Sequence, residues 1–184
     1  MKAPAEITTA RLVLRRPVAS DAEEIFARYA GDASVGRYLA WPIHKTIDDT
    51  RAFLDFSDQE WARWPAGPYL IFSKDTRTLL GSTGFSFETY GRASTGYVLA
   101  RDSWNKGFAT EATEAMKQVA AQVGAGELFA CCHPDHQPSR RVLDKCGFVE
   151  ERSLQLKCEF PNLAPGILLD AVCYVWTAKL EQGI

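Results

Sequence analysis

The sequence lacks any hydrophobic run of the length that a membrane requires. No window approaches the roughly 18 consecutive apolar residues of a spanning helix. The opening residues, MKAPAEITTARLVLRR, also lack the apolar centre, about 7 to 15 residues long, of a secretory signal peptide. We therefore expect a cytoplasmic protein that has no membrane partner.

Cysteine and histidine are few, and their spacing fits neither a disulfide framework nor a metal site. The five cysteines are an odd number without a C-x-x-C pair, as expected for reduced thiols. One cluster invites a zinc interpretation; it contains Cys131, Cys132, His133, His136 and Cys146. Adjacent residues of a strand point to opposite faces, however, so Cys131 and Cys132 are poorly placed to share one ion. We expect buried, unreactive thiols and no metal.

Neither sign of charge dominates the sequence. The 21 Lys and Arg residues and the 23 Asp and Glu residues give a formal net charge of -2, and the cations are spread along the chain. A protein that binds nucleic acid normally concentrates positive charge on one surface. We therefore expect no direct nucleic-acid partner.

Two glycine motifs that bind nucleotides are also missing, but another kind of phosphate site is indicated. The chain has neither the G-x-G-x-x-G fingerprint nor the phosphate loop that ends in Gly-Lys-Ser/Thr. It does have an apolar strand at 97–100 and a turn containing Gly107, followed by apolar residues at helical spacing: Phe108, Ala112, Met116, Val119, Ala120 and Val123. The first N–H groups of a helix lack intrahelical partners, so this turn can hold a pyrophosphate. The alternative is a glycine that serves packing alone.

The remaining patterns predict one domain, 1–184, with an α/β (α+β) fold. At 184 residues and 46% hydrophobic content, the chain is long enough for one buried core and short for two. Apolar runs predict about seven strands, at 7–16, 69–74, 79–88, 94–100, 128–132, 148–157 and 168–177. Their short links and the interposed helices predict a mixed, mostly antiparallel central sheet flanked by helices. We expect a ligand to enter where neighbouring strands splay.

Five motifs, in this order, cover nearly the whole chain. They are T-x-R-L-x-L-R at 9–15 followed by Asp21-Ala22, Gly81 and Gly84 within a strand, Gly96-Tyr97, W-x-K-G-x-A-T-E-A at 104–112, and S-x-x-V-L-x-K-x-G-F at 139–148. Together they resemble the GNAT superfamily of acetyl-CoA-dependent N-acetyltransferases, and within it the ribosomal-protein N-terminal (Rim-type) branch. The resemblance implies a GNAT-like fold, acetyl-CoA as cosubstrate, and a homodimer.

The resemblance also implies two sets of cofactor contacts. The strand that pairs its backbone with the pantetheine arm corresponds to Val98, Leu99 and Ala100. The turn that wraps the pyrophosphate corresponds to Asn105, Lys106, Gly107, Phe108, Ala109 and Thr110. Lys106 either adds charge to the phosphate contact or is a solvated surface lysine.

Two departures from the family affect the expected chemistry. Many relatives carry a glutamate that acts as the general base where this chain has Ser94. Many superfamily members carry a tyrosine that acts as the general acid where this chain has Leu143. Because Ser139 occupies the serine position of the family's motif, the resemblance implies that it is the leading candidate for the acid that protonates the departing sulfur. The alternative role for Ser139 is to open the helix that begins near Pro138.

His136 and Glu88 are further catalytic candidates. An imidazole has an unperturbed pKa of about 6.5, which suits proton transfer near neutrality; the alternative for His136 is a loop or cap residue. Glu88 precedes Ser94 by one strand and can replace the missing glutamate, unless it is an exposed carboxylate at a strand end. Trp41-Pro42 and the loop to His44 are candidates for lining the site that binds the acceptor amine.

The preferred hypothesis is an N-acetyltransferase that moves the acetyl group of acetyl-CoA directly to a primary amine, on a protein or peptide N-terminus or on a small molecule. Without the glutamate, an α-amino acceptor is favoured, because its pKa of about 7.7 to 8.0 leaves a useful neutral fraction, unlike lysine at about 10.4. The missing glutamate and tyrosine leave open a non-catalytic acyl-CoA-binding or sensor module. A plain interaction domain is the third alternative.

Overall fold

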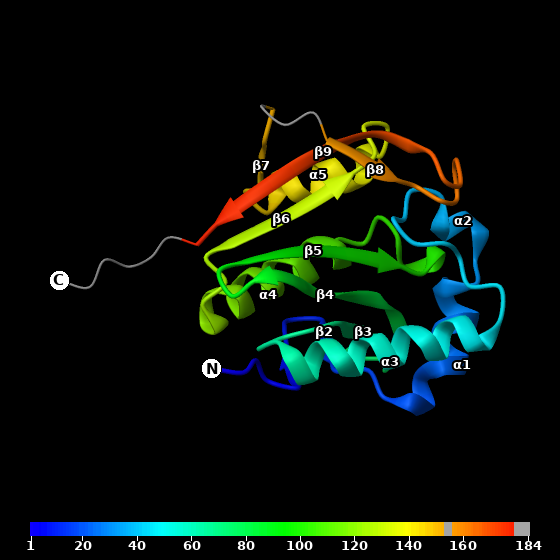
Figure 1. Ribbon diagram of the computed structural model, residues 1–184. Coiled ribbons are helices and arrows are strands. Elements are labelled where there is room, and N and C mark those ends of the chain that lie inside the picture. Colours follow the sequence, from blue (N-terminus) through cyan, green and yellow to red (C-terminus); the bar gives the residue numbers. More distant parts are fainter. Residues whose placement is uncertain (153–155, 179–184) are drawn as a thin grey trace.

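The computed structural model describes residues 1–152 and 156–178, which form a mixed sheet with helices on both faces (Figure 1). Along the sheet, the strands follow the order β1 (Glu6–Thr8), β2 (Leu12–Arg15), β3 (Tyr69–Ser73), β4 (Leu79–Thr89), β5 (Arg92–Leu99), β6 (Glu127–Cys132), β9 (Leu168–Thr177) and β7 (Val149–Glu150), while β8 (Leu156–Glu159) pairs with β9. Only the β5–β6 pair is parallel among these described strands. The predicted mostly antiparallel sheet is therefore confirmed.

Two of the predicted strands are each divided into two shorter ones. The first becomes the β1–β2 hairpin, because the Thr9 hydroxyl accepts a hydrogen bond from the Leu12 N–H at 2.9 Å and fixes a tight turn. The predicted strand at 148–157 becomes β7 and β8, which pair with different parts of β9. Residues 153–155 of that prediction lie outside the described residues.

Helices bury both faces of the sheet (Figure 1). The two sides are covered by α1 (Ala22–Ile25) with α3 (Ile47–Arg63), and by α4 (Phe108–Val123) with α5 (Gln137–Lys145), while α2 (Ala33–Gly36) lies beside the β8–β9 hairpin. The short segments η1 (Ala19–Asp21), η2 (Phe26–Ala30) and η3 (Arg101–Ser103) complete the helical structure that is described. On β2, Leu12 and Leu14 join the core beneath α4, whereas Val13 joins the core beneath α1. This double burial explains the continuous apolar strands.

The parallel pair β5–β6 opens partway along its length (Figure 1). It pairs only from Arg92↔Glu127 to Ser94↔Phe129. Beyond this point β5 stays with β4 as far as Leu99, and β6 stays with β9 as far as Cys132. The sheet therefore splits into two arms, as expected for a ligand entrance. Within the described ranges, no helix combines the length and apolar character needed to span a membrane.

Candidate functional site

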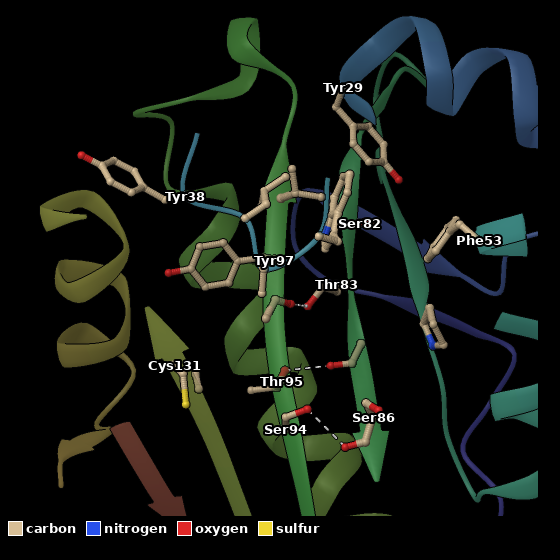
Figure 2. Close-up of a pocket in the computed structure, with 18 of the residues that line it drawn as sticks. Tyr29, Tyr38, Phe53, Ser82, Thr83, Ser86, Ser94, Thr95, Tyr97 and Cys131 are labelled. Carbon is tan, nitrogen blue, oxygen red and sulfur yellow. Dashed lines mark hydrogen bonds between the residues drawn. The ribbon is translucent and has the colours of Figure 1, made fainter. Parts of the chain in front are cut away.

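A cavity of about 930 Å³ lies where β5 and β6 separate. Its walls come from β4, β5 and β6, the segment 38–45, α3 and α5. Figure 2 shows Tyr38 and Tyr97 on the side that α5 closes, with Tyr29 and Phe53 on the opposite side. Its size and aromatic lining are typical of a site for a small ligand.

Aromatic side chains dominate the wall formed by 38–45 and α3, and this wall includes the predicted segment from Trp41 to His44. Among the described residues that line the cavity, Asp49 is the only carboxylate. The backbone N–H groups of Thr46 and Lys45 donate to it at 2.9 and 2.8 Å and hold its pKa below the ordinary value. The carboxylate thus caps α3 through its Oδ2 and stays ionised at the cavity wall.

Ser139 faces the cavity from the first turn of α5 and contacts Tyr97 of β5. The Tyr97 hydroxyl lies 3.0 Å from the Ser139 Oγ and donates to the Ser139 carbonyl oxygen at 3.0 Å. Burial raises the pKa of Tyr97, so its hydroxyl keeps its proton. The N-cap of α5 is His136 and no side chain caps this helix, so the Ser139 hydroxyl does not serve as a cap and contacts Tyr97 instead.

Two histidines line the cavity and favour the neutral form. Burial lowers the pKa of His136, and the neighbouring His133 lowers it further. The His136 Nδ1 is buried without a hydrogen-bond partner among the described residues, and its ring stacks on Tyr38 with centroids 4.8 Å apart. Burial also lowers the pKa of His44, whose Nδ1 lies 2.8 Å from the Thr50 hydroxyl. A neutral imidazole with a free nitrogen can accept a proton.

The structure does not bring Glu88, the third catalytic candidate, to the cavity. The β4–β5 register places Ser86 opposite Ser94, so Glu88 lies further along, at the exposed hairpin end. There its carboxylate pairs with Arg92, which also pairs with Glu127. Ser94 does line the cavity, but its hydroxyl donates to the Ser86 carbonyl oxygen at 3.2 Å. Among the described residues that line the cavity, the only carboxylate is therefore Asp49 of α3, and neither Glu88 nor Ser94 replaces the glutamate of the relatives.

The thiols near the cavity are held in their protonated form. Burial raises the pKa of Cys132 to about 11 and that of Cys146 to about 12. Both side chains are buried. In the part of the chain that the structure describes, no three His, Cys, Asp or Glu residues are grouped as a metal site would require.

The end of β5 presents backbone groups to the open side of the sheet. The Ala100 N–H donates to the Leu80 carbonyl oxygen at 2.8 Å, so Ala100 and, by antiparallel alternation, Val98 bond toward β4. The backbone of Tyr97 and Leu99 consequently faces away from β4. The Leu99 carbonyl oxygen accepts from the Trp104 indole at 2.8 Å, which ties the following turn to this strand.

The turn into α4 has the left-handed backbone that a phosphate seat needs. Asn105 has φ 59° and Gly107, the N-cap, has φ 80°. No side chain caps the first turn, so Phe108, Ala109 and Thr110 present N–H groups at the positive end of a 16-residue helix. Lys106 is exposed beside them. These predicted pyrophosphate contacts are thus gathered at one helix end.

Arg11 and Glu111 fasten this helix end to the β1–β2 turn. The Glu111 carboxylate accepts from the Arg11 guanidinium at 2.7 Å, from the Arg11 N–H at 2.8 Å and from the Thr9 hydroxyl at 2.6 Å. Arg11 also donates to the Lys106 carbonyl oxygen at 2.9 Å. The acidic residue of the first turn is thereby neutralised. The sequence analysis missed this role, because the two partners lie 100 residues apart.

Tyr97 is the other contributor that the sequence analysis did not recognise. The signal was an aromatic residue directly before the strand assigned to pantetheine, at a position of the Gly96-Tyr97 motif. Its partner Ser139 lies 42 residues later, so only the folded chain pairs them.

Comparisons with known proteins agree with this geometry. The family model described as acetyltransferase (GNAT) domain matches residues 11–149. The uncharacterized N-acetyltransferase YoaA of Bacillus subtilis is 29% identical over 157 residues, covering 81% of this chain and 85% of that protein. The uncharacterized N-acetyltransferase p20 of Bacillus licheniformis is 27% identical over 150 residues, covering 80% and 84%.

Two solved structures show the same fold at lower identity. The microcin C7 self immunity acetyltransferase MccE, in complex with acetyl-CoA and AMP, has a TM-score of 0.80 at 22% identity, covering 96% of this chain and 98% of that chain. RimL, a ribosomal L7/L12 alpha-N-protein acetyltransferase in complex with coenzyme A, has a TM-score of 0.78 at 20% identity, covering 94% and 97%.

Proposed function

Because this chain belongs to the GNAT family of acetyltransferases, we propose that it transfers the acetyl group of acetyl-CoA directly to a primary amine bound in the cavity. The observation that carries the proposal is the opening between β5 and β6, where a free backbone edge meets a cavity that contains Ser139 and His136. The uncapped end of α4 follows directly on β5. This arrangement suits a thioester and an amine held side by side.

Acetyl-CoA supplies the activated acetyl thioester, and two sets of residues are proposed to hold it. The N–H groups of Phe108, Ala109 and Thr110, with Lys106 beside them, suit the pyrophosphate. The outward-facing backbone at Tyr97 and Leu99 suits the amide groups of the pantetheine arm, as an added strand would. The fit rests on main-chain groups, which tolerate few changes of backbone conformation.

In the reaction a carbon–nitrogen bond forms and a carbon–sulfur bond breaks. The amine nitrogen loses a proton, and the departing sulfur gains one. The amine nitrogen attacks the thioester carbonyl carbon, and the carbon–sulfur bond breaks without a covalent enzyme intermediate. The Ser139 hydroxyl gives a proton or hydrogen bond to the departing sulfur, and Tyr97 holds that hydroxyl in place. We assign to His136, a neutral imidazole that lines the cavity, the proton that the amine loses.

The cavity favours an amine that carries an apolar or aromatic group and few charges. Its acceptor wall carries several aromatic side chains, and Asp49 is the one carboxylate among the described lining residues. A polyamine would therefore bring several cations to a site with a single carboxylate to balance them, which is costly. An α-amino group suits the site better, because its pKa of about 7.7 to 8.0 lets it enter neutral.

The first experiment measures thermal unfolding with and without acetyl-CoA, and then release of free CoA thiol. A ligand at about 100 times its dissociation constant stabilises the folded state by about 2.7 kcal/mol. The amine panel comprises L-phenylalaninamide, N-α-acetyl-lysine and spermidine. We expect stabilisation by acetyl-CoA and fastest thiol release with L-phenylalaninamide.

The outcomes separate the alternatives. Stabilisation without thiol release from any amine would favour an acyl-CoA-binding module. Acetylation of N-α-acetyl-lysine in preference to L-phenylalaninamide would contradict the α-amine proposal. Absence of stabilisation in folded protein would reject acetyl-CoA as the cosubstrate.

A further inference from the structure

The segment 37–44, between α2 and α3, crosses from one arm of the split sheet to the other, and we call it the acceptor strap. It contributes Tyr38, Trp41 and His44 to the cavity wall. We propose that Asn162, in the connection between β8 and β9, is the positioning residue that holds this strap and thereby sets amine binding. The catalytic consequence rests on the function proposed above, whereas the structural consequence does not.

Three hydrogen bonds join the Asn162 side chain to the backbone around the strap. Its Oδ1 accepts from the Ile43 N–H at 2.9 Å. Its Nδ2 donates to the Gly36 carbonyl oxygen at 2.8 Å and to the Trp41 carbonyl oxygen at 2.9 Å. One amide thus satisfies groups at both ends and in the middle of an irregular segment.

The packing at this point leaves little room for another arrangement. A Cβ on Gly36 would lie 2.1 Å from the Ile43 side chain and 3.4 Å from the Asn162 Nδ2. Gly36 is buried, and Asn162 is half-buried. The absence of a side chain at Gly36 therefore lets Ile43 lie against the backbone, where the amide of Asn162 reaches both.

A second set of contacts, between aromatic rings, holds the same strap. Tyr38 stacks on His136 at 4.8 Å and on His133 at 5.1 Å between ring centroids. His133 in turn meets the edge of Phe160 at 5.2 Å. Phe160 precedes Asn162 by two residues, so the strap is fastened to one connection by an amide and an aromatic stack.

The amide chemistry makes Asn162 hard to replace. An asparagine side chain donates two hydrogen bonds and accepts others, whereas an ionised aspartate only accepts. Asn162→Asp would keep the acceptor for Ile43 but would set a carboxylate against the carbonyl oxygens of Gly36 and Trp41. Asn162→Ala would remove all three bonds, and the Ile43 N–H and the Trp41 carbonyl oxygen would lose this partner, while the Gly36 carbonyl oxygen keeps the Leu39 N–H at 2.9 Å.

Trypsin cleavage measures strap attachment without requiring any reaction. Arg37 and Lys45 are exposed and bracket the strap, so both offer cleavage sites. We expect Asn162→Ala to be cut there about tenfold faster than the wild type, because lost buried hydrogen bonds raise the population of the opened form. Mass spectrometry of the fragments identifies the cleaved bonds.

The matched control is Glu159→Ala, because Glu159 accepts from the Gly166 N–H at 2.9 Å within the same β8–β9 connection. It should perturb that connection without touching the strap. Equal cleavage rates in Asn162→Ala and wild type would overturn the proposal. Equal acceleration in Glu159→Ala would also overturn it, since a general loosening would then explain the effect.

Kinetics test the catalytic consequence with L-phenylalaninamide as the amine. We expect Asn162→Ala and Asn162→Asp to raise the KM for this amine about tenfold and to leave the KM for acetyl-CoA within about twofold. Equal increases in both KM values, or no increase, would refute a role in amine binding. If wild-type enzyme acetylates no amine, the proposed function fails, while the trypsin comparison still decides whether Asn162 holds the strap.

Discussion

The Tyr97 hydroxyl lies 3.0 Å from the Ser139 Oγ, and this contact joins the two arms of the split sheet. Tyr97 belongs to β5, and Ser139 belongs to α5, which packs against β6. Tyr97 also donates to the Ser139 carbonyl oxygen at 3.0 Å. Tyr97 thus contacts both the backbone of the proposed acid, as a donor to its carbonyl oxygen, and its side chain, as a partner of its Oγ.

Removal of this acid should slow the chemical step. We expect Ser139→Ala to lower kcat about 100-fold, because a positioned general acid contributes about 100-fold or more. Tyr97→Phe should lower kcat about tenfold, since Ser139 keeps its hydroxyl but loses its support. Thiol release at saturating acetyl-CoA measures both. Tyr90→Phe is the control, because Tyr90 is an exposed tyrosine at the turn between β4 and β5; kinetics of Ser139→Ala like those of Tyr90→Phe would exclude Ser139 as the acid.

The phosphate seat can be separated from helix stability by two glycines of α4. Gly107 at the N-terminal end has φ 80°, and Gly124 at the C-terminal end has φ 78°. Replacement of either by valine should cost roughly 1–2 kcal/mol of folding free energy, because a valine at either position would have to adopt the left-handed backbone conformation. Only Gly107→Val should also raise the dissociation constant of acetyl-CoA, by about tenfold or more.

Thermal shift titrations with acetyl-CoA provide the measurement for both glycine variants. The added Cβ at Gly107 meets only the Arg11 guanidinium, at 3.4 Å, and the one at Gly124 meets nothing within 4 Å. Steric damage is therefore small at both ends. Similar acetyl-CoA affinities in the two variants would show that the α4 N-terminus is not the phosphate seat.

Arg11 should support acetyl-CoA binding without contacting the amine. Arg11→Ala removes the guanidinium that balances the Glu111 carboxylate, which keeps its bonds from the Thr9 hydroxyl and the backbone N–H of residue 11, so its charge then opposes an anionic ligand at the first turn of α4. We expect the KM for acetyl-CoA to rise about fivefold and the KM for amine to stay within about twofold, and Glu111→Gln in the same chain should restore part of the loss. An unchanged KM for acetyl-CoA would count against this electrostatic explanation.

The chemical step, measured as kcat, should persist at pH values below the ordinary pKa of histidine, about 6.5. Burial lowers the pKa of His136 from 6.5, so its imidazole stays neutral at pH 6.5 and accepts protons until the pH falls through the lowered value. The acidic limb of kcat, measured at saturating neutral amine so that protonation of the free amine does not contribute, should therefore lie below pH 6.5 and disappear in His136→Gln. His44→Gln is the control, because His44 is a second cavity histidine with a lowered pKa. Retention of the limb in His136→Gln would assign it to another group.

The same shift predicts a change in stability with pH. The unfolded chain binds a proton at His136 below about pH 6.5, whereas the folded chain does so only at lower pH. The free energy of unfolding should thus decrease as the pH falls from 6.5 toward the folded pKa. His136→Gln should show a shallower decrease in urea unfolding between pH 6.5 and 5; an identical slope would contradict the lowered pKa.

Local patterns predicted most of the backbone, and their failures have a local cause. The 3.6-residue period placed α4 from Phe108 to Val123, between two glycines that start and end it. The prediction of one continuous strand at 7–16 was wrong, because the Thr9 hydroxyl accepts from the Leu12 N–H and turns the chain into a hairpin where the sequence pattern shows no break. From the sequence alone, a threonine within a strand pattern can either continue the strand or hydrogen-bond to its own backbone and form a turn, and the pattern does not distinguish the two.

The site was predicted less completely than the fold. Ser139 and His136 both line the cavity, whereas the β4–β5 register places Glu88 outside it. Tyr97 was visible as a motif residue but not as the partner of Ser139. The reason is that register and strand separation depend on the packing of the whole sheet, which no short window contains.

The sequence by itself determined the strand and helix periods, the glycine turn that starts α4 at Gly107 and the family, because each depends on residues close together in the chain. Only the tertiary structure decided where β5 leaves β6, which hydroxyl supports Ser139, and that Asn162 holds a strap more than 100 residues away. Such contacts form only after long loops close and both faces of the sheet are buried, and many residues share in that free energy.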